Sequence, residues 1–413
     1  MRRGIVPLAL VCLCAGATML RAQEFKLFDR KVQIHGFASQ GFVYTDQNNW
    51  LTMHSNQGSA AFTDFGANVS MGLSDRLRIG AQFYDRNLGN LGDWHPSLDW
   101  AFADYRIKPW FGIRGGNVKT VIGLYNDTQD YEFLNTFALL PQSVYALDMR
   151  DANIAHAGGD LYGNIPLGHR RGTLSYTVYG GWRWDSYYGG YPYALRKTIA
   201  PINLTSNGGP QYGGDLRWQT PLSGLLVGGS RMNQQDEGKG TFVPFWKPSA
   251  GSIPYWERTR QYWLNQFYGK YSRGPLNLAS EYRRTYIDAI DFNDTSNSQI
   301  DVRSWYVSGS YRLSKHLELG SYYSHYAMTA RYGGILGKAF PPRIDTTLPQ
   351  NHIYDKVISA RIDLNRFWNV KVEGHFMDGY GDGPYPDGFY PGDNPGGFKP
   401  NTNALVVRTG WNF

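Results

Sequence analysis

The chain has 413 residues, of which 18% are charged and 15% are aromatic, and it contains 49 glycines and 30 tyrosines. A helical bundle would draw on Ala, Leu, Glu and Lys, and a disordered chain would be poor in aromatic residues, so the composition argues against both. The formal net charge of +7 is weak and dispersed, which argues against a nucleic-acid partner.

The N-terminus carries the one long apolar run of the sequence. Two arginines precede the run from Ile5 to Leu20, and small residues lead to a predicted cleavage site after Ala22. This pattern is typical of a secretory signal peptide, residues 1–22, and an uncleaved anchor is the alternative. Both cysteines lie inside it, so the mature chain has none. Residues 23–31 are expected to form a short periplasmic N-terminal segment.

After this segment, apolar residues recur at every second position in many short stretches. Phe65, Ala67 and Val69, for example, alternate with small or polar residues. Such alternation predicts β-strands with one apolar and one polar face. Sixteen strands are predicted, at about 32–45, 62–73, 77–85, 98–108, 113–122, 154–163, 173–182, 211–219, 225–232, 260–271, 276–286, 300–313, 317–327, 356–364, 369–377 and 405–413.

The connections between these strands alternate between tight turns and long loops. A soluble sandwich gives no reason for this segregation, whereas an outer-membrane barrel has short periplasmic turns, long external loops and an even number of strands. Aromatic residues gather where girdles are expected, with Trp110 and Trp368 near the short turns and Tyr44, Trp182 and Tyr326 near the long loops. The sequence therefore predicts an all-β fold, a transmembrane antiparallel β-barrel of about 16 strands over residues 32–413.

At its C-terminus the chain resembles bacterial outer-membrane porins. The stretch from Val406 to Phe413 is similar to their closing strand, in which a terminal Phe is the assembly signal, here Trp411 and Phe413. The stretches 113–119, 123–126 and 140–145 are similar to the fifth strand and third loop of the phosphate-selective-porin-like group. The resemblance implies a bacterial outer-membrane location, contact with lipid and the barrel-assembly machinery, a homotrimer, and a third loop, 123–153, folded into the lumen.

That loop is acidic: five acids face one base, a net charge of −4. The candidate constriction residues are Asp127, Asp130, Glu132, Asp148, Arg150 and Asp151. The segment from Leu134 to Leu140 is expected to form a short helix that ends at Pro141. An acidic loop inside a barrel needs water or basic partners, because unpaired buried charge is costly.

Basic and acidic residues are nearly balanced at the strand positions expected to face the lumen. The candidate basic wall is Arg78, Arg106, Lys119, Arg217, Arg283, Arg361, Lys371 and Arg408. The acids on the same faces are Asp104, Asp160, Asp215, Glu281, Glu318, Asp363 and Glu373. Two interpretations remain open: opposed charged walls that orient polar solutes, or cross-strand pairs that tie strands together.

These features predict a porin, a passive diffusion channel for small polar solutes and ions, that is not an enzyme and needs no cofactor. The alternatives are a channel specific for oxyanions or sugars, a barrel phospholipase, and a receptor barrel that does not conduct. The stretch 54–59, His-Ser-Asn-Gln-Gly-Ser, only partly matches a phospholipase motif. Aspartates in the loop 378–394 are a weak candidate for divalent cations, and exposed aromatics such as Trp184 and Tyr187 are a weak candidate for a sugar path.

Overall fold

The computed structural model describes residues 23–27, 30–168, 170–198, 201–244, 248–291, 293–333, 341–381 and 388–413. The predicted signal peptide lies outside the described residues and stays a prediction. Among the residues described, no helix combines the length and the apolar character needed to cross a bilayer.

The strands dominate the chain, and the helices are short. The strands are β1 Gln23–Leu27, β2 Arg30–Thr45, β3 Ser59–Gly72, β4 Leu77–Leu88, β5 Ser97–Lys108, β6 Phe111–Lys119, β7 Ala155–Pro166, β8 Thr173–Trp184, β9 Ile202–Gln219, β10 Leu225–Gln234, β11 Glu237–Phe242, β12 Ile253–Arg273, β13 Leu276–Asp291, β14 Ser296–Arg312, β15 Leu317–Tyr332, β16 His352–Asn365, β17 Trp368–Asp378 and β18 Asn401–Asn412. The helices are α2 Arg150–Asn153 and α3 Gly190–Arg196, with single 3-10 turns at Ser55–Gln57, Glu132–Leu134, Leu147–Met149, Pro248–Ala250, Pro349–Asn351 and Pro391–Asp393.

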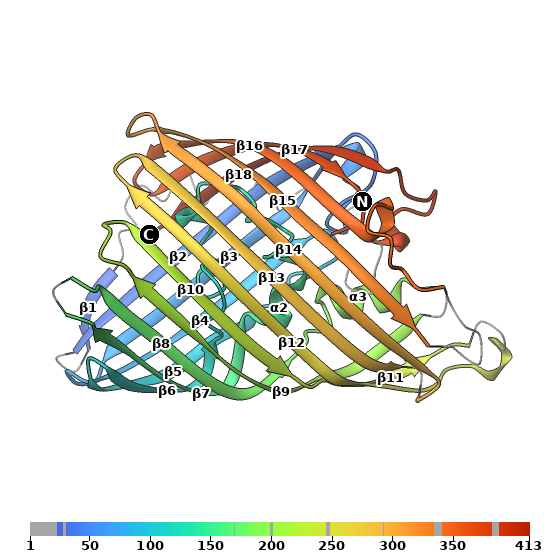
Figure 1. Cartoon of the computed structure of the whole chain (residues 1–413), viewed down its shortest axis with the longest axis horizontal. Coiled ribbons are helices and arrows are strands. Elements are labelled where there is room, and N and C mark those ends of the chain that lie inside the picture. The colour runs from blue at the N-terminus through green and yellow to red at the C-terminus, as the bar shows by residue number, and fades with distance from the viewer. Residues whose placement is uncertain are drawn as a thin grey trace.

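The strands form a closed antiparallel barrel (Figure 1). Each strand pairs with the next, and β18 closes the wall against β2, with Ala404 opposite Thr45 and Asn412 opposite Phe37. β10 and β11 lie end to end between β9 and β12, so together they form one strand of the wall. Closure leaves sixteen strand positions and no free sheet edge, as a lipid environment demands. The predicted strand number is confirmed.

β1 is an addition to the predicted pattern. It pairs antiparallel with the start of β2, from Gln23 opposite Ile34 to Leu27 opposite Arg30. The segment predicted as an N-terminal extension before the barrel is therefore a short strand. β18 leaves this part of the β2 edge unpaired, because its last residue, Phe413, exchanges backbone hydrogen bonds with Gly36. β1 covers the edge beyond that point.

The predicted strand boundaries are close at the short turns and wrong at the long loops. The strand predicted at 211–219 is β9, which begins at Ile202, and the strand predicted at 260–271 is β12, which begins at Ile253. The loop predicted at 287–299 is only the connection between Asp291 and Ser296. These extensions mix buried apolar residues, such as Ile202, Leu204 and Tyr255, with polar and small ones, so the regular alternation of an apolar outer face with a polar inner face is absent there.

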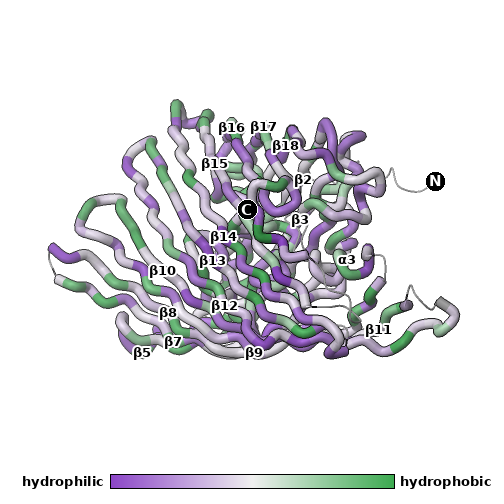
Figure 2. The backbone as a smooth tube through the Cα atoms, turned by 45° about the vertical axis from the view of Figure 1, so that its right-hand side comes forward, coloured by the Kyte–Doolittle hydropathy of each residue, from purple (hydrophilic) through white to green (hydrophobic). Residues whose placement is uncertain are grey.

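The two faces of the wall differ as predicted. On β17, the inward side chains Asn369, Lys371 and Glu373 are fully buried, whereas Phe376 on the outer face is 50% exposed. Figure 2 shows hydrophobic and hydrophilic residues alternating along the strands. Trp110 and Trp368 are exposed on the outer surface, but Tyr326, expected in the outer girdle, is buried inside the barrel.

Candidate functional site

The connection between β6 and β7, residues 120–154, lies inside the barrel and contacts the wall on several sides. The backbone N–H of Gly123 donates to Ser230 of β10 at 2.9 Å, and that of Leu124 donates to Glu281 of β13 at 3.0 Å. The carbonyl of Ala138 accepts from Arg408 of β18 at 2.8 Å. We call residues 120–154 the inward loop. It crosses the lumen rather than lining one side of it.

Charged side chains of β16–β18 hold the part of this loop from Glu132 to Leu139. Arg361 donates to the carbonyls of Phe133 and Asn135 at 2.8 and 2.9 Å, and the Glu373 carboxylate accepts the N–H groups of Ala138 and Leu139 at 2.8 and 3.1 Å. The helix predicted from Leu134 to Leu140 is absent; only Glu132–Leu134 forms a 3-10 turn. The wall satisfies the backbone groups that a helix would have paired internally.

Four of the candidate acids face basic side chains of the wall: Asp127, Asp130, Glu132 and, further along the loop, Asp151. Asp130 is buried, pairs with Lys119 at 2.6 Å and accepts from Gln82 at 2.5 Å. Burial raises the pKa of Asp130, but Lys119 and Arg150 outweigh it, so the pKa lies below its usual value. Asp127 lies 3.9 Å from Arg217. Glu132 pairs with Lys371, whose ammonium also donates to the Glu132 carbonyl at 2.7 Å and the Phe137 carbonyl at 3.2 Å.

Asp151 and the remaining two candidates lie further along the loop. Arg150 pairs with Asp99 of β5 at 2.8 Å, and Asp151 pairs with Arg86 of β4 at 2.9 Å. Asp148 is fully buried without an ion pair within 4 Å among the described residues. Its carboxylate accepts the N–H of Gly388 at 3.0 Å and the hydroxyl of Tyr390 at 2.6 Å. Burial raises the pKa of Asp148 to about 6.

The eight basic candidates divide into two groups. Six contact the inward loop, and five of these do so through ion pairs or hydrogen bonds: Lys119, Arg217, Arg361, Lys371 and Arg408. Arg283 donates to Gln266 at 2.8 Å and lies over the Tyr145 ring of the loop. Arg78 and Arg106 lie near the short turns, beside Asp104 and Tyr162. These distances show charges that pair the inward loop with the wall, an arrangement that differs from both interpretations, opposed charged walls and pairs between strands.

The most crowded contact lies at Glu281. Its carboxylate accepts the hydroxyls of Tyr145 and Tyr306, each at 2.7 Å, and the Gln266 amide at 2.5 Å, in addition to the N–H of Leu124. One cavity, lined by Tyr145, Arg283 and Ser304, borders this contact, and a second, lined by Tyr306, Lys270 and Arg361, borders it as well. The loop therefore narrows the lumen at this point.

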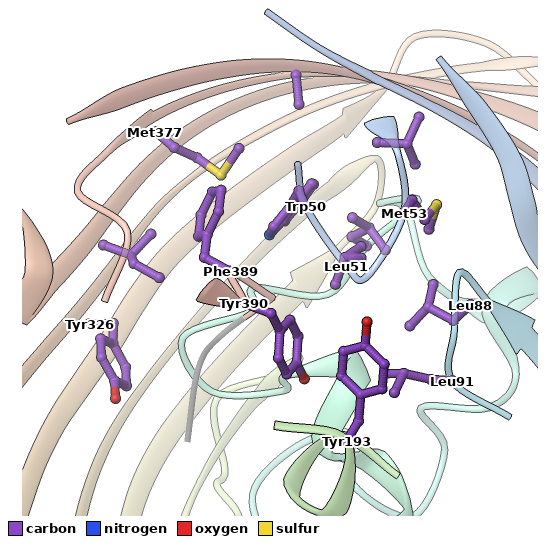
Figure 3. Close-up of a cluster of buried hydrophobic side chains, with 14 of the residues drawn as sticks. Trp50, Leu51, Met53, Leu88, Leu91, Tyr193, Tyr326, Met377, Phe389 and Tyr390 are labelled. Carbon is purple, nitrogen blue, oxygen red and sulfur yellow. The ribbon is translucent and has the colours of Figure 1, made fainter. Parts of the chain in front are cut away.

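At the long-loop end, apolar side chains fill the interior (Figure 3). Trp50 and Leu51 from the β2–β3 loop and Phe389 and Tyr390 from the β17–β18 loop are at most 1% exposed. They pack with inward side chains of the wall, including Met377 of β17. We call this group the mouth cluster. The expectation of a polar inner face fails here, because external loops occupy the space that water would fill.

Sequence reasoning missed two inner arginines that pair with carboxylates at this level. Arg86 contacts the Leu147 carbonyl at 2.6 Å as well as Asp151, and Arg183 pairs with Asp236 at 2.9 Å. Each follows directly on a predicted strand end, at 85 and 182, whereas the strands continue to Leu88 and Trp184. Continuing the alternation by one residue would have placed both inside.

The weaker candidates lie apart from the inward loop. Ser55 is buried and its hydroxyl contacts Thr45 and the N–H of Trp50, which is a structural role within a loop. Trp184 is 61% exposed on the outer face, away from the lumen. In the aspartate loop, residues 382 and 387 lie outside the described residues; within the described part of the chain, no group of His, Cys, Asp or Glu is arranged to hold a metal ion.

Comparison with solved structures defines the class: the chain has the fold of bacterial outer-membrane porins. It matches OmpT, an outer membrane protein of Vibrio cholerae, with a TM-score of 0.55 and 10% identity over 95% of this chain and 100% of that one. For the anion-selective porin from Comamonas acidovorans the TM-score is 0.53, with 10% identity over 93% of this chain and 100% of that one.

A third match is the outer membrane channel DcaP of Acinetobacter baumannii, with a TM-score of 0.52 and 10% identity over 94% of this chain and 99% of that one. No family model matches the sequence, and no curated protein matches it either. At identities this low the likeness establishes the fold alone, so the activity has to be argued from the site.

Proposed function

We propose that the protein is an outer-membrane porin, a passive diffusion channel for small polar solutes and ions. The observation that carries this proposal is the combination of a closed sixteen-strand wall with an ionised interior. Phe83, Phe267 and Ile358 are at least 60% exposed on the outer face, whereas carboxylates and ammonium groups line the inner face. Such a wall suits lipid outside and water inside.

The channel we propose is narrow. The inward loop crosses the lumen, and the mouth cluster occupies its long-loop end. Both features favour a channel that is selective for one class of solute over a wide pore for general diffusion. A catalytic role gains no support from the partial phospholipase motif, because Ser55 is buried in loop contacts.

We also propose that the signal peptide directs export of the chain, that the barrel-assembly machinery inserts it into the outer membrane, and that the channel functions without a cofactor. The proposal also includes assembly as a homotrimer. One solved structure of OmpT from Vibrio cholerae is described as a trimer form, and that description applies to OmpT itself. The chain's barrel fold supports membrane insertion, and cross-linking of the protein in native membranes would test the trimer.

Liposome swelling tests the channel directly. Purified, folded protein is reconstituted into liposomes, which are then diluted into isotonic solutions of sugars, amino acids and organic acids of graded size. Swelling that falls smoothly with solute size indicates general diffusion, and swelling with one class alone indicates a selective channel. Absence of swelling with every solute, from protein shown to be folded, would refute the proposal and favour a receptor barrel.

A further inference from the structure

A third cavity lies at the long-loop end of the lumen, apart from the two that border Glu281 at the constriction. Residues of α2 in the inward loop, of α3, and of β8, β9, β10, β12 and β13 line it. We call it the outer cavity. Its polar lining includes Arg183, Asp185, Asn207, Asp236, Glu257 and Asp291.

The outer cavity carries more acid than base. Arg183 pairs with both Asp185 and Asp236, so one buried guanidinium serves two carboxylates. Glu257 is 7% exposed and accepts the hydroxyls of Tyr255 and Tyr191 at 2.6 and 2.9 Å. Because hydroxyl groups are neutral, they do not balance the charge of the Glu257 carboxylate.

The fourth carboxylate, Asp291, has the same kind of environment. It accepts only the Ser298 hydroxyl, at 3.1 Å, among its described contacts. The nearest rim arginine, Arg258, pairs instead with Asp294 at 3.7 Å and is about half exposed. Within the described part of the chain, no basic side chain lies within 4 Å of Glu257 or Asp291.

Two amide side chains add a second, independent observation. Asn207 donates its amide N–H to Asp185 at 2.5 Å, and Gln234 donates its amide N–H to Asp236 at 2.5 Å. The carboxylates thus fix the orientation of both amides. Their oxygens, Asn207 Oδ1 and Gln234 Oε1, are buried and have no hydrogen-bond partner among the residues that the structure describes, and the two residues are only 7% and 3% exposed.

A buried acceptor without a donor is destabilising, so these oxygens favour a donor that enters the cavity. In the described lining, Arg183 is already engaged by two carboxylates and Arg258 is half exposed and pairs with Asp294, so a cation with several N–H groups supplies both further charge and further donors. A metal ion fits less well, because the described carboxylates do not converge as metal ligands do.

We propose that the outer cavity binds the cationic head of a small organic solute, a primary ammonium or a guanidinium. The inference rests on the proposed channel function only in that the solute arrives through the mouth of the barrel. Tyr191 and Tyr262 also line the cavity, and aromatic rings attract such cations. The neighbouring cavity shares Met149, Asn153 and Tyr262, so an alkyl tail can extend toward the constriction.

Isothermal titration of the folded, detergent-solubilised barrel with agmatine, at low salt, tests this site without requiring conduction. The variants are Glu257→Gln with Asp291→Asn, and the matched control is Asp288→Asn. Asp288 lies on the same strand as Asp291, but it pairs with Arg260 on the outer face. Heat-modifiable electrophoretic mobility verifies that each variant is folded.

We expect the wild type and the control to bind agmatine with equal affinity, and the double variant to bind at least about tenfold more weakly, since a charged hydrogen bond contributes about 1.5–3 kcal/mol. Equal binding by all three proteins, or no binding by the wild type, overturns the proposal. If the wild type binds neutral butylurea, or Ca²⁺ alone, as tightly as it binds agmatine, the ligand is not an organic cation, and the assigned ligand class is wrong. Binding without swelling of liposomes would refute the channel and leave this site standing.

Discussion

Lys371→Met tests whether buried charge holds the inward loop against the wall. The Lys371 ammonium is fully buried, and the substitution removes its ion pair with Glu132 and its hydrogen bonds to the carbonyls of Glu132 and Phe137. The Glu132 carboxylate, on a residue only 4% exposed, is then left without its partner. Breaking one side of a buried pair costs about 3–5 kcal/mol. At 1.4 kcal/mol per factor of ten, local opening of residues 131–140 should rise about 10²- to 10³-fold.

Hydrogen exchange followed by mass spectrometry measures this opening, because loop amides exchange through local unfolding. The control is the double variant Lys371→Met with Glu132→Gln, which removes both charges and should recover much of the protection, since replacing a whole buried pair is often nearly neutral. Peptides from the turn at residues 313–316, far along the chain, should not change. Unchanged protection in the single variant, or equal loss in the double variant, would refute the reasoning.

Three further predictions concern the latch, the closing strand and the ion preference. The latch is the pair of hydrogen bonds that Asp148 of the inward loop accepts from Gly388 and Tyr390 of the β17–β18 loop. When the inward loop is detached from the β17–β18 loop, Asp148 should have its ordinary pKa of 3.8, whereas in the docked state its pKa is about 6. The docked state therefore binds a proton more tightly, and contact between the two loops should strengthen as pH falls from 6 to 4. In hydrogen-exchange experiments, Asp148→Asn should abolish this pH dependence. Deleting Phe413 should prevent barrel assembly, seen as lost heat-modifiable mobility, because part of the β2 edge loses its backbone partner. Neutralising the acids that face lysine or arginine should free positive charge in the lumen and shift the reversal potential toward anions, less so at molar salt. That triple variant carries Asp127→Asn, Asp130→Asn and Glu132→Gln.

Each of these has an outcome that counts against it. The latch is wrong if Asp148→Asn keeps the pH dependence of the wild type. Normal assembly without Phe413 would remove the closing role of that residue. For the ion preference, Asp345→Asn on an exposed loop is the control, and an equal shift from it and from the triple variant would place the inward-loop acids outside the ion path.

The sequence was sufficient for the barrel because the membrane imposes its pattern on the strands. Alternation such as Val370, Val372 and Phe376 exists where lipid faces one side and the interior the other, so all sixteen strands were found. It fails near the long loops, where strands such as β9 carry the buried apolar residues Ile202 and Leu204 beside a run of polar and small residues. The short turns were predicted well because they end the pattern abruptly.

The site was less accessible to sequence reasoning, because its contacts join residues far apart in the chain. Alternation along the strands indicates which charged residues face the lumen, but nothing in the sequence pairs Lys371 with Glu132 or Asp148 with Tyr390. Trp50 and Phe389 lie in loops whose composition suggests exposure, so the mouth cluster was not foreseen. Apolar residues within two separate long loops are the signal that could have indicated it.

Single-channel current across a planar bilayer tests most directly whether the barrel is a water-filled channel narrowed by the inward loop. The wild type should insert in discrete, ohmic steps, and Lys371→Met should give larger or noisier steps, because its loop detaches more often from β17. Absence of steps from wild-type protein whose heat-modifiable mobility shows a folded barrel would contradict the channel, and identical steps from the two proteins would contradict the narrowing by the loop.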